Sequence, residues 1–249
     1  MSDGAIHRVW PAPGPLDDDA LFEAYRPPAD RPTLRVNFVA SLDGAAWSQG
    51  RSRGLSTPAD RHVFGVLRAR ADAILVGAGT LRDESYGPAV VRPELRDRRR
   101  AAGHAGDPVL AIVSAALDLD PTGPAFSQAP VRPLVCTVAS APAQRRAALA
   151  EVADVVTCGE STVDLARVRA VLHDRGLRAV LCEGGPRLFG GLVAADLVDE
   201  LCLTVSPLLA GAGAGRIVDG PPTPVPHPMR LVHLLASEGT LLTRYARAR

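Results

Sequence analysis

The 249-residue sequence contains no lysine, since all 28 of its basic residues are arginines. Schiff-base chemistry and a lysine general base are therefore excluded on the protein side. Arginine remains available for binding phosphate groups. The sequence also has almost no net charge, because 28 basic residues face 27 acidic ones. This balance gives no electrostatic reason to expect a nucleic acid or an anionic membrane as a partner.

Cysteine is scarce as well, and no CxxC pair occurs among Cys136, Cys158, Cys182 and Cys202. We interpret these four as small buried residues rather than as disulfides or metal ligands. The six histidines lack zinc-ligand spacing, so no metal site is predicted. The start of the chain has no signal pattern, and no apolar run approaches the ~18 residues of a membrane span. We therefore expect a reduced, cytoplasmic protein.

With 47% hydrophobic residues, the 249-residue chain suits one large α/β domain or two small ones. We divide it into a proline-rich arm, residues 1–32, and a single domain, residues 33–249. Within the arm, the run DDDALFEAY predicts one short helix with Asp17 as its N-cap. The arm has two interpretations, a disordered tail or a segment docked on the surface. Leu21, Phe22 and Tyr25 stand at helical spacing, which favours docking.

The domain alternates strands with helices. Residues 34–40 predict a strand, and Thr57-Pro58 begins a helix as N-cap and first-turn proline. Val63, Val66 and Leu67 lie on one face of that helix, which should pack on the sheet. Further strands are predicted at 73–77, 109–113, 133–138, 153–157, 178–183 and 199–205. Further helices are predicted near 142–150, 164–176 and 186–196.

The C-terminal part differs, because two extended runs at 229–236 and 239–247 flank Glu238-Gly239 and predict a hairpin. The fold class is therefore α/β, with three α/β/α layers, a mostly parallel central sheet and a C-terminal antiparallel hairpin. Outside this framework, the arginine run at 96–100 lies in a proline- and glycine-bounded stretch, 87–108, interpreted as a solvated loop. The glycine-rich stretch 207–222 is likewise interpreted as a flexible loop, with a lid or pocket wall as its alternative.

Polar motifs follow two of the early strands. Asp43 stands in SLDG at the end of the first strand, where a carboxylate can bind a ligand or transfer a proton, although Asp-Gly alone indicates a turn. The segment GRSRG at 50–54 matches the GxSxG pattern of serine hydrolases. That pattern needs a strand directly before it and a helix directly behind it. Neither is predicted here, so Ser52 is not expected to be a nucleophile.

Two glycine turns also follow predicted strands. GAGT at 77–80 resembles the start of a dinucleotide fingerprint, but Arg82 stands where GxGxxG needs a glycine. It still permits a close backbone approach, with Thr80 as a donor or N-cap. CEGGPRLFGG at 182–191 is more specific, because two glycines turn the chain and Pro186 opens a helix whose free N–H groups face the turn. Such a helix start can bind a pyrophosphate.

These motifs carry a family resemblance. The sequence resembles the pyrimidine reductase domain of riboflavin biosynthesis in the order of its motifs. These are SLDG, GRSRGLSTPADR, LRARADA, ILVGAGTLRDE and, far downstream, LCEGGPRLFGGLVAADLVDELCLTVSPLLAG. The resemblance covers roughly residues 33–247. It implies a dihydrofolate-reductase-like fold, a nicotinamide cofactor taken to be NADPH, and hydride transfer. It also implies a homodimer, for which the apolar C-terminal strands could supply the interface.

The resemblance also assigns residues. Two acids, Asp43 and Glu183, are assigned to catalysis by orienting the pyrimidine and the ribose. The substrate and its phosphate are assigned to Ser52, Arg68 and Arg92. Cofactor contacts are assigned to Gly77, Gly79, Thr80, Glu84, Ser114, Gly184, Gly185, Pro186, Arg187 and Leu188. Glu84 departs from the aspartate usual in the family, and Asp83 could serve instead.

The predicted activity is NADPH-dependent reduction of 5-amino-6-(5-phosphoribosylamino)uracil at C1′ of the ribose, which gives the ribitylamino product. The zinc deaminase often fused to such reductases is marked by H-x-E and P-C-x-x-C, and neither pattern occurs in these 249 residues. Two alternatives stay open: a dihydrofolate or other pterin reductase on the same fold, and a non-catalytic NADP-binding protein.

Overall fold

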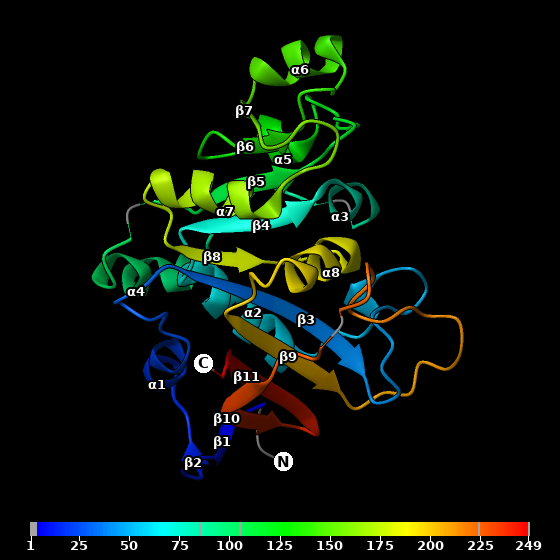
Figure 1. Ribbon diagram of the computed structural model, residues 1–249. Helices are drawn as coiled ribbons and strands as arrows, with labels where there is room; N and C mark the ends of the chain where they lie inside the picture. Colours follow the sequence, from blue (N-terminus) through cyan, green and yellow to red (C-terminus); the bar gives the residue numbers. More distant parts are fainter. Residues whose placement is uncertain (1–3, 85, 105, 224, 249) are drawn as a thin grey trace.

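Figure 1 shows the computed structural model of the protein, which describes residues 4–84, 86–104, 106–223 and 225–248. The strands are β1 (His7–Trp10), β2 (Gly14–Pro15), β3 (Thr33–Ser41), β4 (Ala73–Gly77), β5 (Val109–Val113), β6 (Leu134–Thr137), β7 (Asp154–Thr157), β8 (Ala179–Cys182), β9 (Glu200–Ser206), β10 (Met229–Ser237) and β11 (Thr240–Arg247). The α-helices are α1 (Asp18–Ala24), α2 (Pro58–Ala69), α3 (Ala78–Asp83), α4 (Arg96–Ala101), α5 (Pro124–Ser127), α6 (Ala143–Ala150), α7 (Leu165–Asp174) and α8 (Pro186–Ala194). Two short 3₁₀ turns are η1 (Ser52–Gly54) and η2 (Pro93–Leu95).

All the strands form one sheet in the order β2-β1-β10-β11-β9-β3-β8-β4-β5-β6-β7. The seven strands from β9 to β7 are parallel, whereas β11 is antiparallel to both β9 and β10. The predicted C-terminal hairpin is thus confirmed as β10 and β11. Because β3, β8 and β4 are parallel neighbours, their carboxyl ends meet at one edge of the sheet, where open α/β sheets bind ligands.

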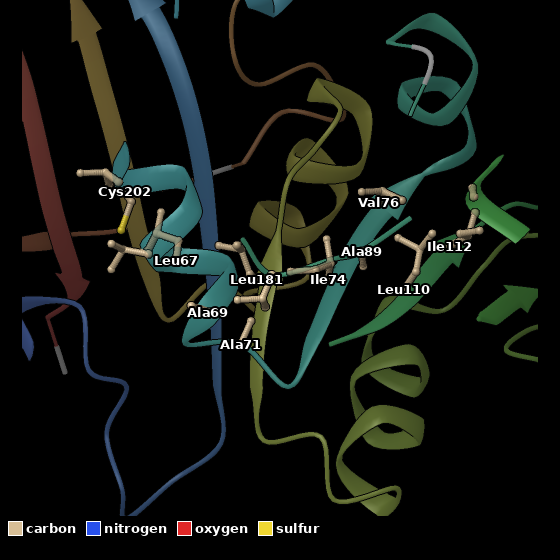
Figure 2. Packing of buried hydrophobic residues seen from close by; sticks show 14 of the residues in the cluster. Leu67, Ala69, Ala71, Ile74, Val76, Ala89, Leu110, Ile112, Leu181 and Cys202 are labelled. Atoms are coloured by element: carbon tan, nitrogen blue, oxygen red, sulfur yellow. The ribbon is translucent and has the colours of Figure 1, made fainter. Parts of the chain in front are cut away.

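Helices cover both faces of the parallel part of the sheet, which confirms the three-layer prediction (Figure 1). One core cluster includes Leu67 of α2 packed near Ile74 and Leu181 of the sheet, as Figure 2 shows. The second cluster lies on the opposite face and includes Leu172 of α7 and Leu192 of α8. All four cysteines are buried as free thiols, as predicted. Within the described ranges, no helix is both long and apolar enough to cross a membrane.

The helix α2 forms as the sequence predicts. Thr57 is its N-cap, and its side chain accepts a hydrogen bond from the Asp60 N–H at 3.2 Å. Val63, Val66 and Leu67 are each 3% exposed or less. The helix therefore buries its predicted face against the sheet, which fixes the direction in which its polar residues point.

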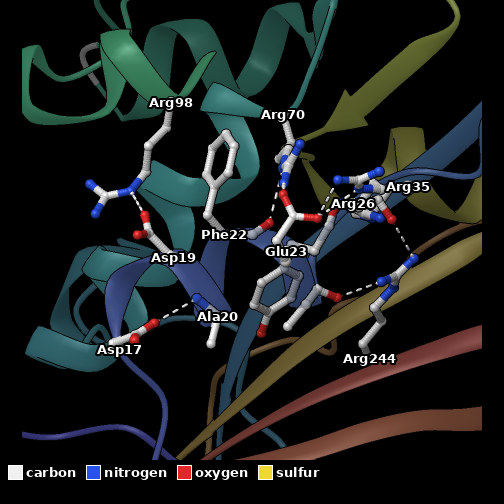
Figure 3. A network of polar contacts seen from close by, with 12 residues as sticks. Asp17, Asp19, Ala20, Phe22, Glu23, Arg26, Arg35, Arg70, Arg98 and Arg244 are labelled. Atoms are coloured by element: carbon white, nitrogen blue, oxygen red, sulfur yellow. Dashed lines mark hydrogen bonds and ion pairs between the residues drawn. The ribbon is translucent and has the colours of Figure 1, made fainter. Parts of the chain in front are cut away.

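The proline-rich arm is docked, in agreement with the interpretation that its helix favoured. Leu21, Phe22 and Tyr25 are at most 4% exposed, and Asp17 caps α1 by accepting from the Ala20 N–H at 2.7 Å. The Arg70 guanidinium lies 3.6 Å from the Phe22 ring centroid (Figure 3). The arm also adds β1 to the sheet through β10, a pairing that the sequence analysis did not predict.

A buried Arg-Glu-Arg cluster ties the arm to the sheet. Glu200 of β9 forms ion pairs with two arginines. Its Oε2 lies 2.6 Å from Nη2 of Arg35 in β3, and its Oε1 lies 2.6 Å from Nη2 of Arg244 in β11. The same guanidinium groups donate to carbonyls of the arm, at Tyr25 (2.9 Å) and Ala24 (2.6 Å). Figure 3 shows both arginines reaching toward α1. Although burial raises the pKa of Glu200, the two cations outweigh it and lower that pKa.

The interpretation of 87–108 as a solvated loop was wrong at the arginine run. Residues 93–101 form η2 and α4, and the Arg99 side chain is buried. Its guanidinium donates to the carbonyls of Ala69 at 3.0 Å and Gly106 at 2.6 Å. Arginine is readily buried when its five N–H groups find carbonyl acceptors, and a run of like charges gives no sign of which member does so.

The unfolding free energy should fall as the pH decreases from about 6.5 toward 3, because burial and then the cations Arg244 and Arg35 lower the pKa of His233 to about 3. The unfolded chain binds that proton near pH 6.5, so the stabilisation is complete above pH 6.5 and is lost progressively below it. Urea unfolding at pH 7.5, 6 and 5 measures the effect. His233→Leu should flatten the pH dependence, whereas the exposed control His7→Leu should not. Equal slopes in both variants would refute this origin.

Candidate active site

Two adjoining cavities lie at the carboxyl ends of β3, β4 and β8. The larger holds about 720 Å³ and the other about 700 Å³. They share a wall made of Trp47, Thr80, Asp83, Gly185 and Pro186. Two ligands bound side by side would therefore meet at this wall, which is the arrangement that a transfer reaction between them requires.

The smaller cavity is built on the two glycine turns. It is lined by most of the residues assigned to the cofactor, namely Gly77, Gly79, Thr80, Gly185, Pro186, Arg187 and Leu188. A Cβ placed on Gly185 would lie 2.8 Å from Thr80 Oγ1. A side chain at this position would therefore fill the space between Gly185 and Thr80, which we call the cradle. Gly185 is also the N-cap of α8 and offers no side chain to the first turn. The first-turn N–H groups are therefore available to an anionic ligand.

Charged side chains complete this cavity. Arg82, Arg187 and Arg216 line it together with Asp83 and Asp219. The Arg187 side chain is 93% exposed, and its Nε lies 3.4 Å from Asp219 Oδ2. Three arginines beside a glycine-rich helix start suit a ligand with several phosphates, such as a phosphorylated dinucleotide.

The larger cavity holds the substrate candidates Ser52 and Arg92. Glu84, predicted as a cofactor contact, also lines it, and its Oε1 accepts from the Ser52 N–H at 2.9 Å. Glu84 thus positions the η1 turn rather than lining the smaller cavity. Asn37 and Phe38 of β3 add a polar amide and an aromatic face, which are suited to a flat heterocycle.

Glu183 lies at the end of β8 and lines the larger cavity, although its side chain is only 3% exposed. Arg68 of α2 forms a two-point ion pair with it, from Nε to Oε1 at 2.8 Å and from Nη2 to Oε2 at 2.7 Å. Arg68 itself is not among the described residues that line either cavity. The structure thus joins a predicted catalytic acid to a predicted substrate residue.

Asp43 lies at the turn after β3, and its carboxylate accepts hydrogen bonds from other groups of the protein. It accepts from the Ser41 hydroxyl and from the backbone N–H groups of Ala210 (3.1 Å) and Gly211 (2.8 Å). These bonds, the Ser41 bond most of all, lower the pKa of Asp43 to about 2. The turn is therefore connected to the glycine-rich loop 207–222, which also contacts Trp47 at Gly215. This arrangement supports the pocket-wall alternative for that loop.

Two assigned cofactor residues, Ser114 and Gly184, are not among the described residues that line either cavity. Ser114 is buried after β5, and its Oγ accepts from the Leu117 N–H at 3.0 Å, so it closes a turn. Gly184 has a φ of +101°, and a Cβ there would lie 3.0 Å from Phe38 Cζ. Only glycine combines that backbone conformation with this close aromatic contact.

Three residues of the site, Trp47, Tyr86 and Arg216, are not predicted from the sequence. Trp47 follows SLDG closely and could have been suspected as an aromatic within a polar block. Tyr86 and Arg216 lie in segments without periodic structure. The partner of Tyr86, Glu183, is distant in the sequence, and Arg216 joins the site only through the smaller cavity. Within the described residues, no group of three His, Cys, Asp or Glu side chains could hold a metal ion.

Comparisons with known proteins agree with this geometry. The sequence matches the family model described as the RibD C-terminal domain over residues 32–242. The 2,5-diamino-6-ribosylamino-4(3H)-pyrimidinone 5′-phosphate reductase of Archaeoglobus fulgidus is 31% identical over 192 residues, which cover 76% of this chain and 87% of the relative.

Two further proteins extend the comparison. A solved pyrimidine reductase-like protein from Corynebacterium diphtheriae is 30% identical, with a TM-score of 0.78 over 88% of this chain and 92% of that one. The riboflavin biosynthesis protein RibD of Escherichia coli is 25% identical over 190 residues, which cover 74% of this chain but 50% of that protein. The chain thus matches most of the shorter relatives and half of the longer one.

Proposed function

The chain belongs to the RibD C-terminal domain family, and from this premise we propose that it reduces 5-amino-6-(5-phosphoribosylamino)uracil with NADPH. It is an oxidoreductase of riboflavin biosynthesis. The observation that carries the proposal is the pair of cavities that meet at Trp47 and Thr80. One contains the start of α8, which has no side-chain cap, and the other contains the buried acid Glu183.

The cofactor belongs in the smaller cavity. Bound NADPH supplies a hydride from C4 of its nicotinamide to C1′ of the ring-opened ribose, whose imine nitrogen takes up a proton. The cradle at Gly185 and the first turn of α8 would hold its pyrophosphate. Trp47 and Thr80 would hold the nicotinamide end, because they line both cavities.

The substrate belongs in the larger cavity, where the chain binds and orients it. Ser52 and Arg92 would hold its polar groups and phosphate, while Glu183 accepts a hydrogen bond from a ribose hydroxyl. Asp43 would contribute by fixing the loop 207–222 against the turn that leads to Trp47. Because the reaction needs no strong nucleophile, placing C1′ beside the nicotinamide is the main task of these residues.

A preference for NADPH over NADH follows from the arginines of the smaller cavity. Replacing Arg187 and Arg216 together with alanine should raise the KM for NADPH about tenfold to a hundredfold, the usual range for losing charge-assisted hydrogen bonds. The KM for NADH should change little, because NADH lacks the 2′-phosphate. Arg100→Ala, at an exposed arginine of α4, serves as the control. An equal rise in KM for both cofactors would show that these arginines do not bind the 2′-phosphate.

A homodimer is proposed through the half-exposed face of β9, β11 and β10. Leu201 and Leu203 pair with Tyr245 and Thr243 on this face, and Leu241 is 38% exposed beside Val205. Light scattering should give twice the chain mass of 26.1 kDa. Leu241→Glu should shift the protein toward the monomer, whereas Leu209→Glu in the loop 207–222 should not. A wild-type monomer would contradict the proposal.

The function is tested by following NADPH absorbance with three substrates in parallel. These are the phosphoribosylaminouracil, the 2,5-diaminopyrimidinone phosphate for which the archaeal relative is named, and dihydrofolate. Oxidation with either phosphorylated pyrimidine supports a riboflavin-pathway reductase, and the faster one identifies the physiological form. Oxidation with dihydrofolate alone would indicate a pterin reductase. Binding of NADPH without oxidation would indicate a cofactor-binding protein.

A further inference from the structure

Three side chains from distant segments converge behind the wall of the larger cavity. Arg68 comes from α2, Tyr86 from the segment after α3, and Glu183 from the end of β8. The Tyr86 hydroxyl donates to Glu183 Oε2 and accepts from Arg68 Nη2 at 2.8 Å. Each of the three therefore contacts the other two, and the cluster forms a closed hydrogen-bonded triangle.

The triangle is largely buried, since the Glu183 side chain is 3% exposed and the Arg68 side chain 17% exposed. The Arg68 guanidinium lies 4.6 Å from the ring centroid of Phe64 and 5.4 Å from that of Tyr86. Burial and then the Glu183 carboxylate raise the pKa of Tyr86 well above its ordinary value, so its hydroxyl keeps its proton and acts as a donor. Glu183 and Phe64 line the cavity, whereas Arg68 and Tyr86 are absent from the linings of the described residues. The acid therefore faces the ligand, and its two partners support it from behind.

The contacts determine which oxygen of Glu183 is presented. An ionised carboxylate offers about four acceptor positions, two on each oxygen. Within the described residues, Oε2 accepts hydrogen bonds from Arg68 Nη2 and from the Tyr86 hydroxyl, while Oε1 accepts one from Arg68 Nε alone. One acceptor position on Oε1 is thus left for a donor in the cavity.

We propose that Arg68 and Tyr86 are positioning residues, which hold Glu183 so that Oε1 accepts a hydrogen bond from a substrate hydroxyl. This inference rests on the proposed function, because the hydroxyl belongs to the ribose chain of that substrate. Tyr86 occupies Oε2 and prevents the carboxylate from rotating about its own axis. Arg68 then acts on the substrate through Glu183, which explains why a residue assigned to substrate binding lies outside the cavity.

Tyr86→Phe tests the proposal, because it removes one hydroxyl and keeps the ring that packs on Arg68. We expect kcat/KM for the pyrimidine substrate to fall about tenfold to a hundredfold. The Kd for NADPH, measured by fluorescence, should not change. The matched control is Tyr25→Phe, which removes a tyrosine hydroxyl from the arm at a residue that lines neither cavity.

A coupling experiment separates positioning from a general structural effect. Tyr86→Phe is combined with Glu183→Gln, and the rates are measured in single turnovers with enzyme in excess. The loss caused by Tyr86→Phe should shrink to about twofold or less when Glu183 is already replaced, because the hydroxyl acts only through that carboxylate. Arg68→Lys keeps the charge but not the two-point geometry, and it should also lower kcat/KM.

Three outcomes would overturn the inference: a Tyr86→Phe variant as active as the Tyr25→Phe control, an equal loss with and without Glu183, or a loss that follows the Kd for NADPH. An inactive wild-type protein would instead reject the proposed function. An active wild type with an unaffected Tyr86→Phe variant would reject the positioning role alone. The two failures are therefore distinguishable.

Discussion

Glu183→Gln should lower kcat/KM for the pyrimidine substrate about a hundredfold to a thousandfold, the range seen when one preorganised polar contact to the reacting group is removed. Glutamine has nearly the same size, but it carries no charge and cannot accept both donors of Arg68. The side chain is 3% exposed and its pair with Arg68 is largely desolvated. The change therefore removes the anion that lines the larger cavity and leaves a buried cation without its partner.

The measurement is steady-state kinetics together with NADPH binding and thermal unfolding. Glu94→Gln, at an exposed glutamate in η2, is the matched control and should behave as the wild type. The Kd for NADPH should be unchanged, because Glu183 lines the larger cavity and not the smaller one. A kcat/KM within about twofold of the wild type would exclude Glu183 from the reaction.

Glu200→Gln should lower the free energy of unfolding by about 3–5 kcal/mol, since breaking a buried ion pair leaves uncompensated charge. Glu200 is 4% exposed and is shared by Arg35 and Arg244, so one substitution affects both cations. For a chain of this size the melting temperature should fall by about 6–20 °C. The arm should loosen too, because the same arginines bind its carbonyls.

Urea unfolding and limited proteolysis measure these two effects. Asp97→Asn is the control, because its pair with Arg100 is exposed, with side chains 91% and 70% accessible. An exposed pair contributes about 0–1 kcal/mol, so this variant should stay close to the wild type. A Glu200→Gln variant that loses less than about 1 kcal/mol and keeps its arm protected would show that the cluster does not hold the arm.

Much of the architecture follows from local patterns. The strands β4 and β5 begin and end at the predicted residues, because continuous apolar runs bounded by turn residues specify buried parallel strands. The helix α2 was predicted from its cap and apolar face, and both are present. The glycine turns 77–80 and 184–185 were found because a close backbone approach restricts the residue type.

What the sequence did not reveal depends on contacts between distant segments. The arm strand β1 is short and pairs with β10 more than 200 residues later, so no local pattern marks it. Tyr86 meets Glu183 across 97 positions of sequence. The charge of Arg68 was visible, but its partner was not, because a guanidinium can bind a phosphate or a carboxylate equally well. Only the folded chain places it beside Glu183.

The most direct test of the central claim is to follow deuterium from NADPH labelled at C4 of the nicotinamide. Reactions with the two stereochemically labelled forms are analysed by mass spectrometry and NMR of the ribitylamino product. One form should deliver a single deuterium to C1′ and the other none, because in the proposed site the two cavities would hold hydride donor and acceptor in one fixed relation. Product without deuterium from either form, or no product from either phosphorylated pyrimidine, would contradict hydride transfer in this site.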